Sequence, residues 1–189
     1  MSSPKRIHIY GHVSAQPQAI ANLFDAQLAS EIVAESDLAI FAINPAAGID
    51  QKTIDQWQAL SDFQLPRLVV VNELDGSDAD FEDAIMLANR VFDQLVTPFL
   101  VLHSESGSPI ALISLSDLQI IDYSTKPPTI SASGSEHQEL VSEFRDEYLE
   151  EIAGAGENAF AAGLLFPAIP IVISNGLGID VVKSFIAQL

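Results

Sequence analysis

Cysteine is absent from this chain of 189 residues, and basic residues are scarce. Without cysteine there is no disulfide framework, no thiolate nucleophile and no cysteine-based zinc or iron–sulfur site. Only 8 Lys and Arg residues stand against 26 Asp and Glu residues, which gives a formal net charge of −18. This surplus repels nucleic acid, phosphate-rich ligands and anionic membranes, so it excludes a basic nucleic-acid module and direct membrane binding.

Long apolar runs are missing as well. None approaches the roughly 20 residues that a membrane-spanning helix needs, and the N-terminus leads into a strand-like run that is too short for a secretory signal. The simplest compartment is therefore the cytoplasm. Hydrophobic residues make up 48% of the chain, which is too much for disorder, and the length predicts a single domain over residues 1–189.

The apolar residues alternate between short β-branched runs and longer amphipathic stretches. The short runs predict strands at Arg6–Tyr10, Leu38–Asn44, Arg67–Asn72, Pro98–Leu102 and Ile169–Ser174. Most are almost continuously apolar, which is typical of parallel strands that are covered on both faces. Three- and four-residue spacing of apolar side chains predicts helices at Pro17–Glu35, Asp50–Phe63, Asp78–Leu95 and Gly178–Leu189. The fold class is therefore α/β, with helices on both faces of a mostly parallel sheet.

One segment, residues 103–156, departs from this alternation. It contains two short β-like runs, then a Pro- and Ser-rich stretch at 124–135 that predicts a loop, and an acidic helix at Glu136–Ile152. We interpret residues 103–156 as a small α/β insert on the main sheet.

Polar residues follow the predicted strands, where a nucleotide site is expected in such a fold. The first strand ends in Gly11, and the P-loop template places Gly-Lys-Ser/Thr at the positions of Gln16, Pro17 and Gln18. Gln16 brings a side chain where glycine lets the backbone approach phosphate, Pro17 has neither charge nor N–H, and Gln18 is a poor magnesium ligand. Alone, this match is weak, and an ordinary strand–loop–helix turn explains it better.

The third strand leads into Asn72-Glu73-Leu74-Asp75, and the last one into Ser174-Asn175-Gly176. GTPases read guanine with Asn-Lys-x-Asp after a strand and with a Ser-Ala-x loop. Asn72, Asp75 and Ser174 fit these positions, whereas Glu73 replaces the lysine. Each fragment alone is unspecific, because Asn-x-x-Asp also occurs as a turn or capping device.

The order and spacing of the fragments resemble the G domain of translational GTPases, specifically elongation factor G and its relatives. Lys5–Ala15 looks like that family's first strand and loop, and Leu28–Thr53 is similar to the region that follows its second switch. Pro66–Phe81 is the most specific match, to P-R-I-x-F-x-N-K-M-D-x-x-G-A-D-F. The resemblance spans nearly the whole chain. It implies a three-layer, P-loop NTPase-like sheet, with residues 103–156 as the family's insert subdomain.

The departures from the family pattern concern the phosphate chemistry. The P-loop lysine, the first switch and the Asp-x-x-Gly-His motif are missing, and we expect Pro17–Glu35 to be two family helices fused across that deletion. Phosphoryl transfer depends on positioning, magnesium and charge neutralisation. We therefore expect a truncated, degenerate G domain with no catalytic residue, no resident cofactor and no GTP hydrolysis. Weak binding of GTP or GDP through Asn72, Asp75 and Ser174 is the alternative, which Glu73 and the overall charge disfavour.

Other site types have little support. The histidines at 8, 12, 103 and 137 lack metal-ligand spacing, so no metal site is expected. The acidic clusters do not match a calcium loop and suit solvated helix faces better. Loss of the switch region should expose strand edges and apolar surface. We therefore expect a protein-interaction or regulatory module that binds a protein partner, forms a homodimer or belongs to a larger parent protein.

Overall fold

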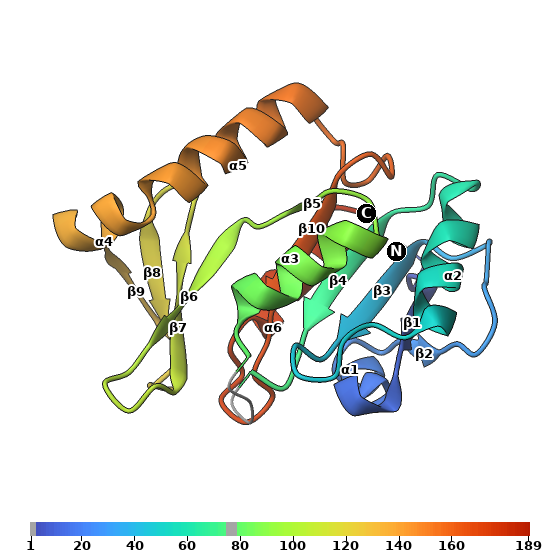
Figure 1. Cartoon of the computed structure of the whole chain (residues 1–189), viewed down its shortest axis with the longest axis horizontal. Coiled ribbons are helices and arrows are strands. Elements are labelled where there is room, and N and C mark those ends of the chain that lie inside the picture. The colour runs from blue at the N-terminus through green and yellow to red at the C-terminus, as the bar shows by residue number, and fades with distance from the viewer. Residues whose placement is uncertain (1–2, 75–78) are drawn as a thin grey trace.

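A computed structural model describes residues 3–74 and 79–189 and contains two sheets (Figure 1). One is a six-stranded sheet in the order β2-β1-β3-β4-β10-β5, and the other is a four-stranded sheet in the order β6-β7-β8-β9. All pairings within the first are parallel and all within the second are antiparallel. The α/β class predicted from the alternating pattern is confirmed.

The parallel sheet is built from the most apolar runs of the chain. Its strands are β1 (Ile7–Gly11), β2 (Gln27–Leu28), β3 (Leu38–Ile43), β4 (Arg67–Val71), β5 (Leu95–Val96) and β10 (Phe166–Pro170). Every residue of β3 and β4 is buried, as continuous apolar runs predict for central parallel strands. The first three predicted strands are confirmed, whereas β10 begins three residues before the predicted strand Ile169–Ser174 and ends at Pro170.

Helices cover both faces of this sheet. They are α1 (Pro17–Leu23), α2 (Gln51–Ser61), α3 (Phe81–Val91) and α6 (Ile179–Ile186). The connections through α2 and α3 run across the sheet in one direction and the connection through α1 runs in the other, so right-handed crossovers place α1 on the opposite face. Figure 1 shows α3 crossing the sheet on the side away from α6. The chain ends meet where the Lys5 Nζ donates to the Leu189 carbonyl at 2.6 Å.

The prediction of one helix over Pro17–Glu35 is wrong, and so is the idea of two fused helices. The helix α1 ends at Leu23, Asp25 takes a left-handed φ of 51°, and the chain then adds β2 to the edge of β1. Leu28 and Ile32 match helical spacing but are exposed. Backbone pairing with β1 therefore decides the structure of this stretch.

The antiparallel sheet comprises β6 (Phe99–His103), β7 (Pro109–Ser114), β8 (Gln119–Asp122) and β9 (Thr129–Ala132). The prediction that Pro98–Leu102 belongs with the parallel strands is wrong, because β6 pairs antiparallel with β7 while Leu95–Val96 pairs with β10. The predicted loop at 124–135 contains β9, whose four residues are all exposed. An exposed edge strand has no apolar face, so its sequence resembles a loop.

The acidic helix of the same part of the chain is interrupted. It consists of α4 (Ser135–Leu140) and α5 (Ser142–Ala155), which meet at Val141. The predicted helix Asp78–Leu95 is also shorter, because a capping box between Asp80 and Asp83 starts α3 at Phe81 and the chain leaves the helix at Phe92.

The main core lies on both faces of the parallel sheet and reaches the antiparallel sheet through β7. Leu112 packs into the main core, whereas its neighbour Ile113 joins Leu100, Leu115 and Val141 in a second cluster. Because successive side chains of a strand point to opposite faces, β7 connects the two clusters. No helix in the described ranges, 3–74 and 79–189, has the length and apolarity to cross a membrane.

Candidate functional site

The loop after β1 occupies the place of a phosphate-binding loop but is folded onto itself. Gly11 has a φ of 148°, and a Cβ atom there would lie 2.5 Å from the Ala42 carbonyl oxygen, so close approach of β3 requires glycine. His12 to Gln16 form a short 3₁₀ turn, Val13–Ala15, in place of an open cradle. The glycine therefore serves the contact between strands.

The backbone N–H groups of this turn are already used. The Ser14 N–H donates to the His12 Nδ1 at 3.1 Å, and the Ala15 and Gln16 N–H groups donate to the carbonyls of His12 and Val13 at 3.0 Å. Pro17 follows at the first position of α1 and has no N–H. A phosphate-binding loop offers successive N–H groups to its ligand. Residues 14–17 offer none of these without refolding.

Two asparagines hold the same turn from neighbouring strands. The Asn72 Nδ2, at the end of β4, donates to the Ala15 carbonyl at 3.0 Å, and Asn72 is buried. The Asn44 Nδ2, at the end of β3, donates to the Ser14 carbonyl at 2.9 Å. The sequence argument missed Asn44, although an asparagine directly after a buried strand is the same signal that identified Asn72. Both side chains orient the loop, since the Nδ2 of each points into it.

Glu73 extends this contact. It adopts a left-handed φ of 65°, and its carboxylate accepts a hydrogen bond from the Gln16 side chain. Gln16 also has a left-handed φ, 54°. The two side chains that replace the glycine and the lysine of the GTPase pattern thus bond to each other, and they bring a carboxylate to the place where the family pattern has cations.

The other two predicted base-reading residues have different outcomes. Asp75 lies outside the described residues. Ser174 lies in the turn after β10, beside an antiparallel bridge between Val172 and Leu177. Because β10 is adjacent to β4, Ser174 and Asn72 lie at the same edge of the sheet. Asn175 donates from Nδ2 to the Pro109 carbonyl at 3.0 Å, which ties this turn to the antiparallel sheet.

His8 has a local structural role. The His8 Nδ1 lies 2.6 Å from the Ser36 Oγ, and burial together with nearby Arg6 lowers the pKa of His8. The Tyr10 hydroxyl accepts from the Val33 N–H at 3.0 Å. These contacts fasten the segment between β2 and β3 to β1. Within residues 3–74 and 79–189, no group of three or more His, Asp or Glu residues is arranged to hold a metal ion.

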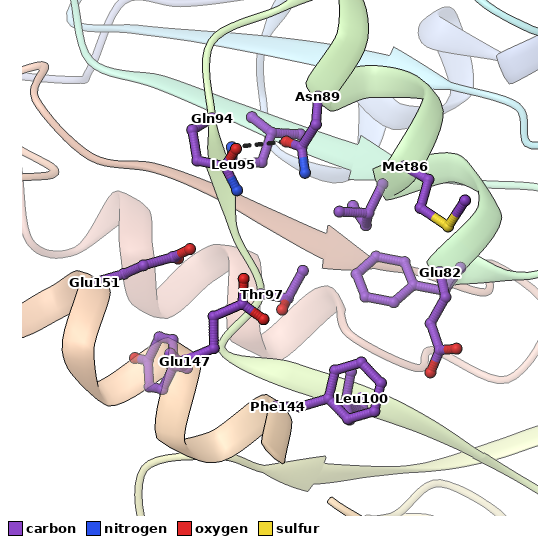
Figure 2. A pocket seen from close by; sticks show the side chains of 13 residues that line it. Glu82, Met86, Asn89, Gln94, Leu95, Thr97, Leu100, Phe144, Glu147 and Glu151 are labelled. Atoms are coloured by element: carbon purple, nitrogen blue, oxygen red, sulfur yellow. Dashed lines mark hydrogen bonds between the residues drawn. The ribbon is translucent and has the colours of Figure 1, made fainter.

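The surface of the molecule has two larger hollows. One, of about 510 Å³, lies beside the loop after β1 and is lined by Val13, Gln16, Leu28 and Lys52, among others. The other, of about 330 Å³, lies between α3 and α5 (Figure 2). Sequence reasoning found neither, because each is assembled from segments far apart in the chain.

Comparison with known proteins finds relatives among translation factors. An elongation factor G-like protein of Mycobacterium tuberculosis (strain H37Rv) is 31% identical over 167 residues, which cover 76% of this chain and 23% of that protein. The mitochondrial ribosome-releasing factor 2 of Drosophila melanogaster is 25% identical over 124 residues, covering 62% of this chain and 17% of the factor. No family model matches.

Solved structures agree on the fold. A crystal structure of a Thermus thermophilus protein superposes with a TM-score of 0.71 at 21% identity and covers 82% of this chain and 26% of that one. The chain spans less than a quarter of the length of the Mycobacterium tuberculosis relative. Sequence and fold together show that the chain is related to the elongation factor G-like translational GTPases, of which it matches one segment.

Proposed function

We propose that the chain is a catalytically inactive relative of the G domain of translational GTPases and that it acts as a protein-interaction or regulatory module. The closed loop after β1 is the observation that supports this most directly. Its N–H groups at Ser14, Ala15 and Gln16 bond within the turn, and Pro17 contributes none. A nucleotide phosphate would have to break these hydrogen bonds before it could form its own.

Electrostatics supports the same proposal. Glu73 bonds to Gln16 at the place where a GTPase presents positive charge, and Lys52 alone supplies a cation among the described residues that line the hollow beside this loop. A polyphosphate without the lysine and magnesium that neutralise it is strongly repelled by a chain of net charge −18. Phosphoryl transfer would therefore lack the positive charge that stabilises its transition state.

The interaction role follows from the edge of the sheet. The edge strand β2 has only two residues, one of which is Leu28, 49% exposed; Val13, which lines the same hollow, is 77% exposed. Exposed apolar side chains next to an unpaired strand edge are typical of a contact surface. A partner protein or a second copy of the chain would cover this edge.

Nucleotide titration tests the inactivity. At 1 mM GDP or GTP with magnesium, a dissociation constant of about 10 μM would stabilise the fold by ~2.7 kcal/mol. For a chain of this size that is a rise of about 5–11 °C in the unfolding midpoint. We expect no rise, and no phosphate release above that of an Asp75→Ala control.

A rise that Asp75→Ala abolishes would contradict the proposal and support weak guanine-nucleotide binding through Asn72, Asp75 and Ser174. Sedimentation then separates the two kinds of interaction. A mass twice the 20.3 kDa of the chain indicates a homodimer, whereas a mass of 20.3 kDa excludes one, and a monomer that also retains no protein in a pull-down would contradict the interaction role.

A further inference from the structure

The strand β9 forms a free edge of the antiparallel sheet. It is the last strand in the order β6-β7-β8-β9, and Figure 1 shows it on the side of this sheet away from the parallel sheet. All four residues of Thr129–Ala132 are exposed, and Ile130 is 64% exposed. No strand among residues 3–74 and 79–189 pairs with the outer edge of β9. This edge therefore offers backbone hydrogen-bonding groups to a further strand.

Two residues of β9 direct their backbone N–H and C=O groups outward. The Tyr123 N–H donates to a carbonyl of β7 at 2.9 Å. Because backbone groups alternate in direction along a strand, the neighbouring residue Asp122 turns its own toward β9, where it lies opposite Thr129. By the same alternation, the N–H and C=O groups of Ile130 and Ala132 point away from β8.

The edge lacks the features that usually block the addition of a strand. Charged side chains, proline and bulges protect many edge strands. Thr129–Ala132 contains neither a charge nor a proline, and its pairing with β8 is continuous. The uncharged stretch extends over residues 127–135, in a chain of net charge −18. It is therefore a surface at which a second copy of the chain meets little charge of its own sign.

An apolar row of side chains reaches this edge. Leu112, Ile121 and Ile130 lie opposite one another on β7, β8 and β9. Leu112 is buried in the main core and Ile121 packs against that core, whereas Ile130 is left exposed at the end of the row. A strand added to β9 would extend the row and cover Ile130.

Opposite charges flank the uncharged stretch symmetrically. Lys126 precedes it and Glu136 follows it, each five residues from Ser131, and both are exposed. Within the described residues neither takes part in an ion pair. An antiparallel pair of identical edges centred on Ser131 brings Lys126 of each copy to the end of the pair where Glu136 of the other copy lies. A parallel pair would instead bring like charges together.

Hydrogen bonding favours the same register. When the pair is centred on Ser131, Ile130 of one copy lies opposite Ala132 of the other, so the outward N–H and C=O groups of both residues are used. A pair centred on Ile130 would place Ala132 opposite Pro128, which has no N–H. A pair centred on Ala132 would place Ile130 opposite Gly134, whose carbonyl already accepts from a backbone N–H of α4 at 3.1 Å.

We propose that two copies of the chain form a symmetric dimer through antiparallel pairing of their β9 edges, centred on Ser131, which joins the two four-stranded sheets into one. Charges farther than about 8 Å from the contact are largely screened at physiological ionic strength. The paired stretch is short, so the interface is small and the dissociation constant is on the order of 100 μM. This inference rests on the interaction half of the proposed function and names the partner and the contact.

A single introduced cysteine tests the register, because the chain has no cysteine of its own. In the proposed pair Ser131 lies opposite Ser131 of the other copy, with a Cα separation of about 4.5 Å that suits a disulfide. With oxidised glutathione, Ser131→Cys should therefore form a covalent dimer. Thr129→Cys, on the same face of the same strand, should form about tenfold less, because its two copies would lie at opposite ends of the pair.

Charge reversal tests the contact without changing the strand. Lys126→Glu and Glu136→Lys should each raise the dissociation constant about fivefold, measured by sedimentation between about 10 μM and 1 mM chain. The variant with both changes keeps the net charge of −18 and should regain the original association. Net charge alone predicts the opposite for Glu136→Lys, namely tighter association, because that change makes the chain less acidic.

A further pair of variants locates the contact on β9. Ile130→Pro removes an outward N–H and no hydrogen bond to β8, so it should abolish the dimer. Leu28→Ser changes the other exposed strand edge, on β2, and should leave the dissociation constant within threefold of its original value. Circular dichroism of each variant separates a folding defect from a loss of association, and the charge reversals still decide the matter if Ile130→Pro does not fold.

Four results would overturn the proposal: a mass of 20.3 kDa up to 1 mM chain, equal cross-linking of the two cysteine variants, no recovery in the double charge reversal, or loss of the dimer with Leu28→Ser and not with Ile130→Pro. A monomer that retains another protein in a pull-down would overturn the β9 dimer and leave the interaction role standing. Stabilisation by nucleotide, with the β9 dimer intact, would overturn only the proposed inactivity.

Discussion

The guanidinium of Arg67 is buried at the start of β4 and offers a sharp test of how the parallel sheet is held together. It lies over the rings of Trp57 and Phe166, with its Cζ 4.2 Å and 4.4 Å from their centroids. One terminal nitrogen donates to the Trp57 carbonyl and to the Ser61 Oγ, both at 3.0 Å. The other lies 3.5 Å from the Asp93 Oδ2, which also accepts from the Trp57 Nε1 at 2.9 Å. The perturbation is Asp93→Ala, alone and combined with Arg67→Met.

The expected magnitude follows from the unequal burial of the two charges. Breaking a fully buried pair costs ~3–5 kcal/mol and an exposed pair contributes ~0.2–1 kcal/mol. The Arg67 side chain is 3% exposed and that of Asp93 is 52% exposed, so the pair lies between these limits. Asp93→Ala breaks the ion pair and also removes the hydrogen bond of the Trp57 indole, so it should lower the free energy of unfolding by about 3 kcal/mol. In a chain that already carries Arg67→Met, the same change removes only the indole hydrogen bond and should cost about 1.5 kcal/mol.

Urea unfolding of the four proteins in this double-mutant cycle measures the coupling. Trp57 is the only tryptophan of the chain, so its fluorescence reports directly on this cluster, and circular dichroism provides a second probe. We expect a coupling free energy of about 1.5 kcal/mol between Arg67 and Asp93. A coupling below about 0.5 kcal/mol would refute the reasoning, because Arg67 would then be held by its ring and carbonyl contacts alone.

Two further predictions concern the hollow between α3 and α5 and the first loop. Glu82→Gln should raise the thermal unfolding midpoint at pH 7, since the folded-state pKa of Glu82 is raised and its charged form destabilises the fold. This gain should shrink as the pH falls through that raised pKa, and exposed Glu136→Gln is the control; a constant gain across pH 4–8 would contradict it. Gly11→Ala should cost about 3 kcal/mol or more in urea unfolding, because its Cβ would meet the Ala42 carbonyl oxygen at 2.5 Å. Gly107→Ala, at a φ of 87° with no atom within 4 Å of its Cβ, should cost only about 1 kcal/mol, and equal losses would show that the β3 contact does not matter.

The parallel strands were predictable because their burial leaves a local trace. The continuous apolar runs at Leu38–Ile43 and Arg67–Val71 are buried throughout, and nothing in their sequence competes with a strand. The stretch after Leu23 was not predictable in this way, because Leu28 and Ile32 have helical spacing whereas pairing with the edge of β1 determines the backbone at Gln27 and Leu28. β9 was missed for the opposite reason, since its residues are paired on the edge of a sheet but bury nothing.

In the candidate site, too, some features were predictable from the sequence and others depend on the folded structure. Asn72 could be placed at the carboxyl edge of the sheet from its position after a strand, yet the direction of its amide, toward the Ala15 carbonyl, depends on the loop that it meets. That the N–H groups of residues 14–16 are consumed within their own turn is likewise a property of the folded loop. The substitutions Gln16, Pro17 and Glu73 identified the departure from the GTPase sequence pattern, and the hydrogen bonds of the turn show the structure that these residues adopt.

The sequence by itself determined the α/β class, the acidic character, the absence of cysteine chemistry and the relationship to translational GTPases, because each is expressed in composition or in short-range pattern. Only the tertiary structure decided the closed turn after β1, the separation into a parallel and an antiparallel sheet, and the hollow between α3 and α5. These depend on residues that are distant in the chain, such as Met86 and Phe144 on the two walls of one hollow. Such arrangements arise from packing and edge pairing of whole elements, which no local pattern encodes.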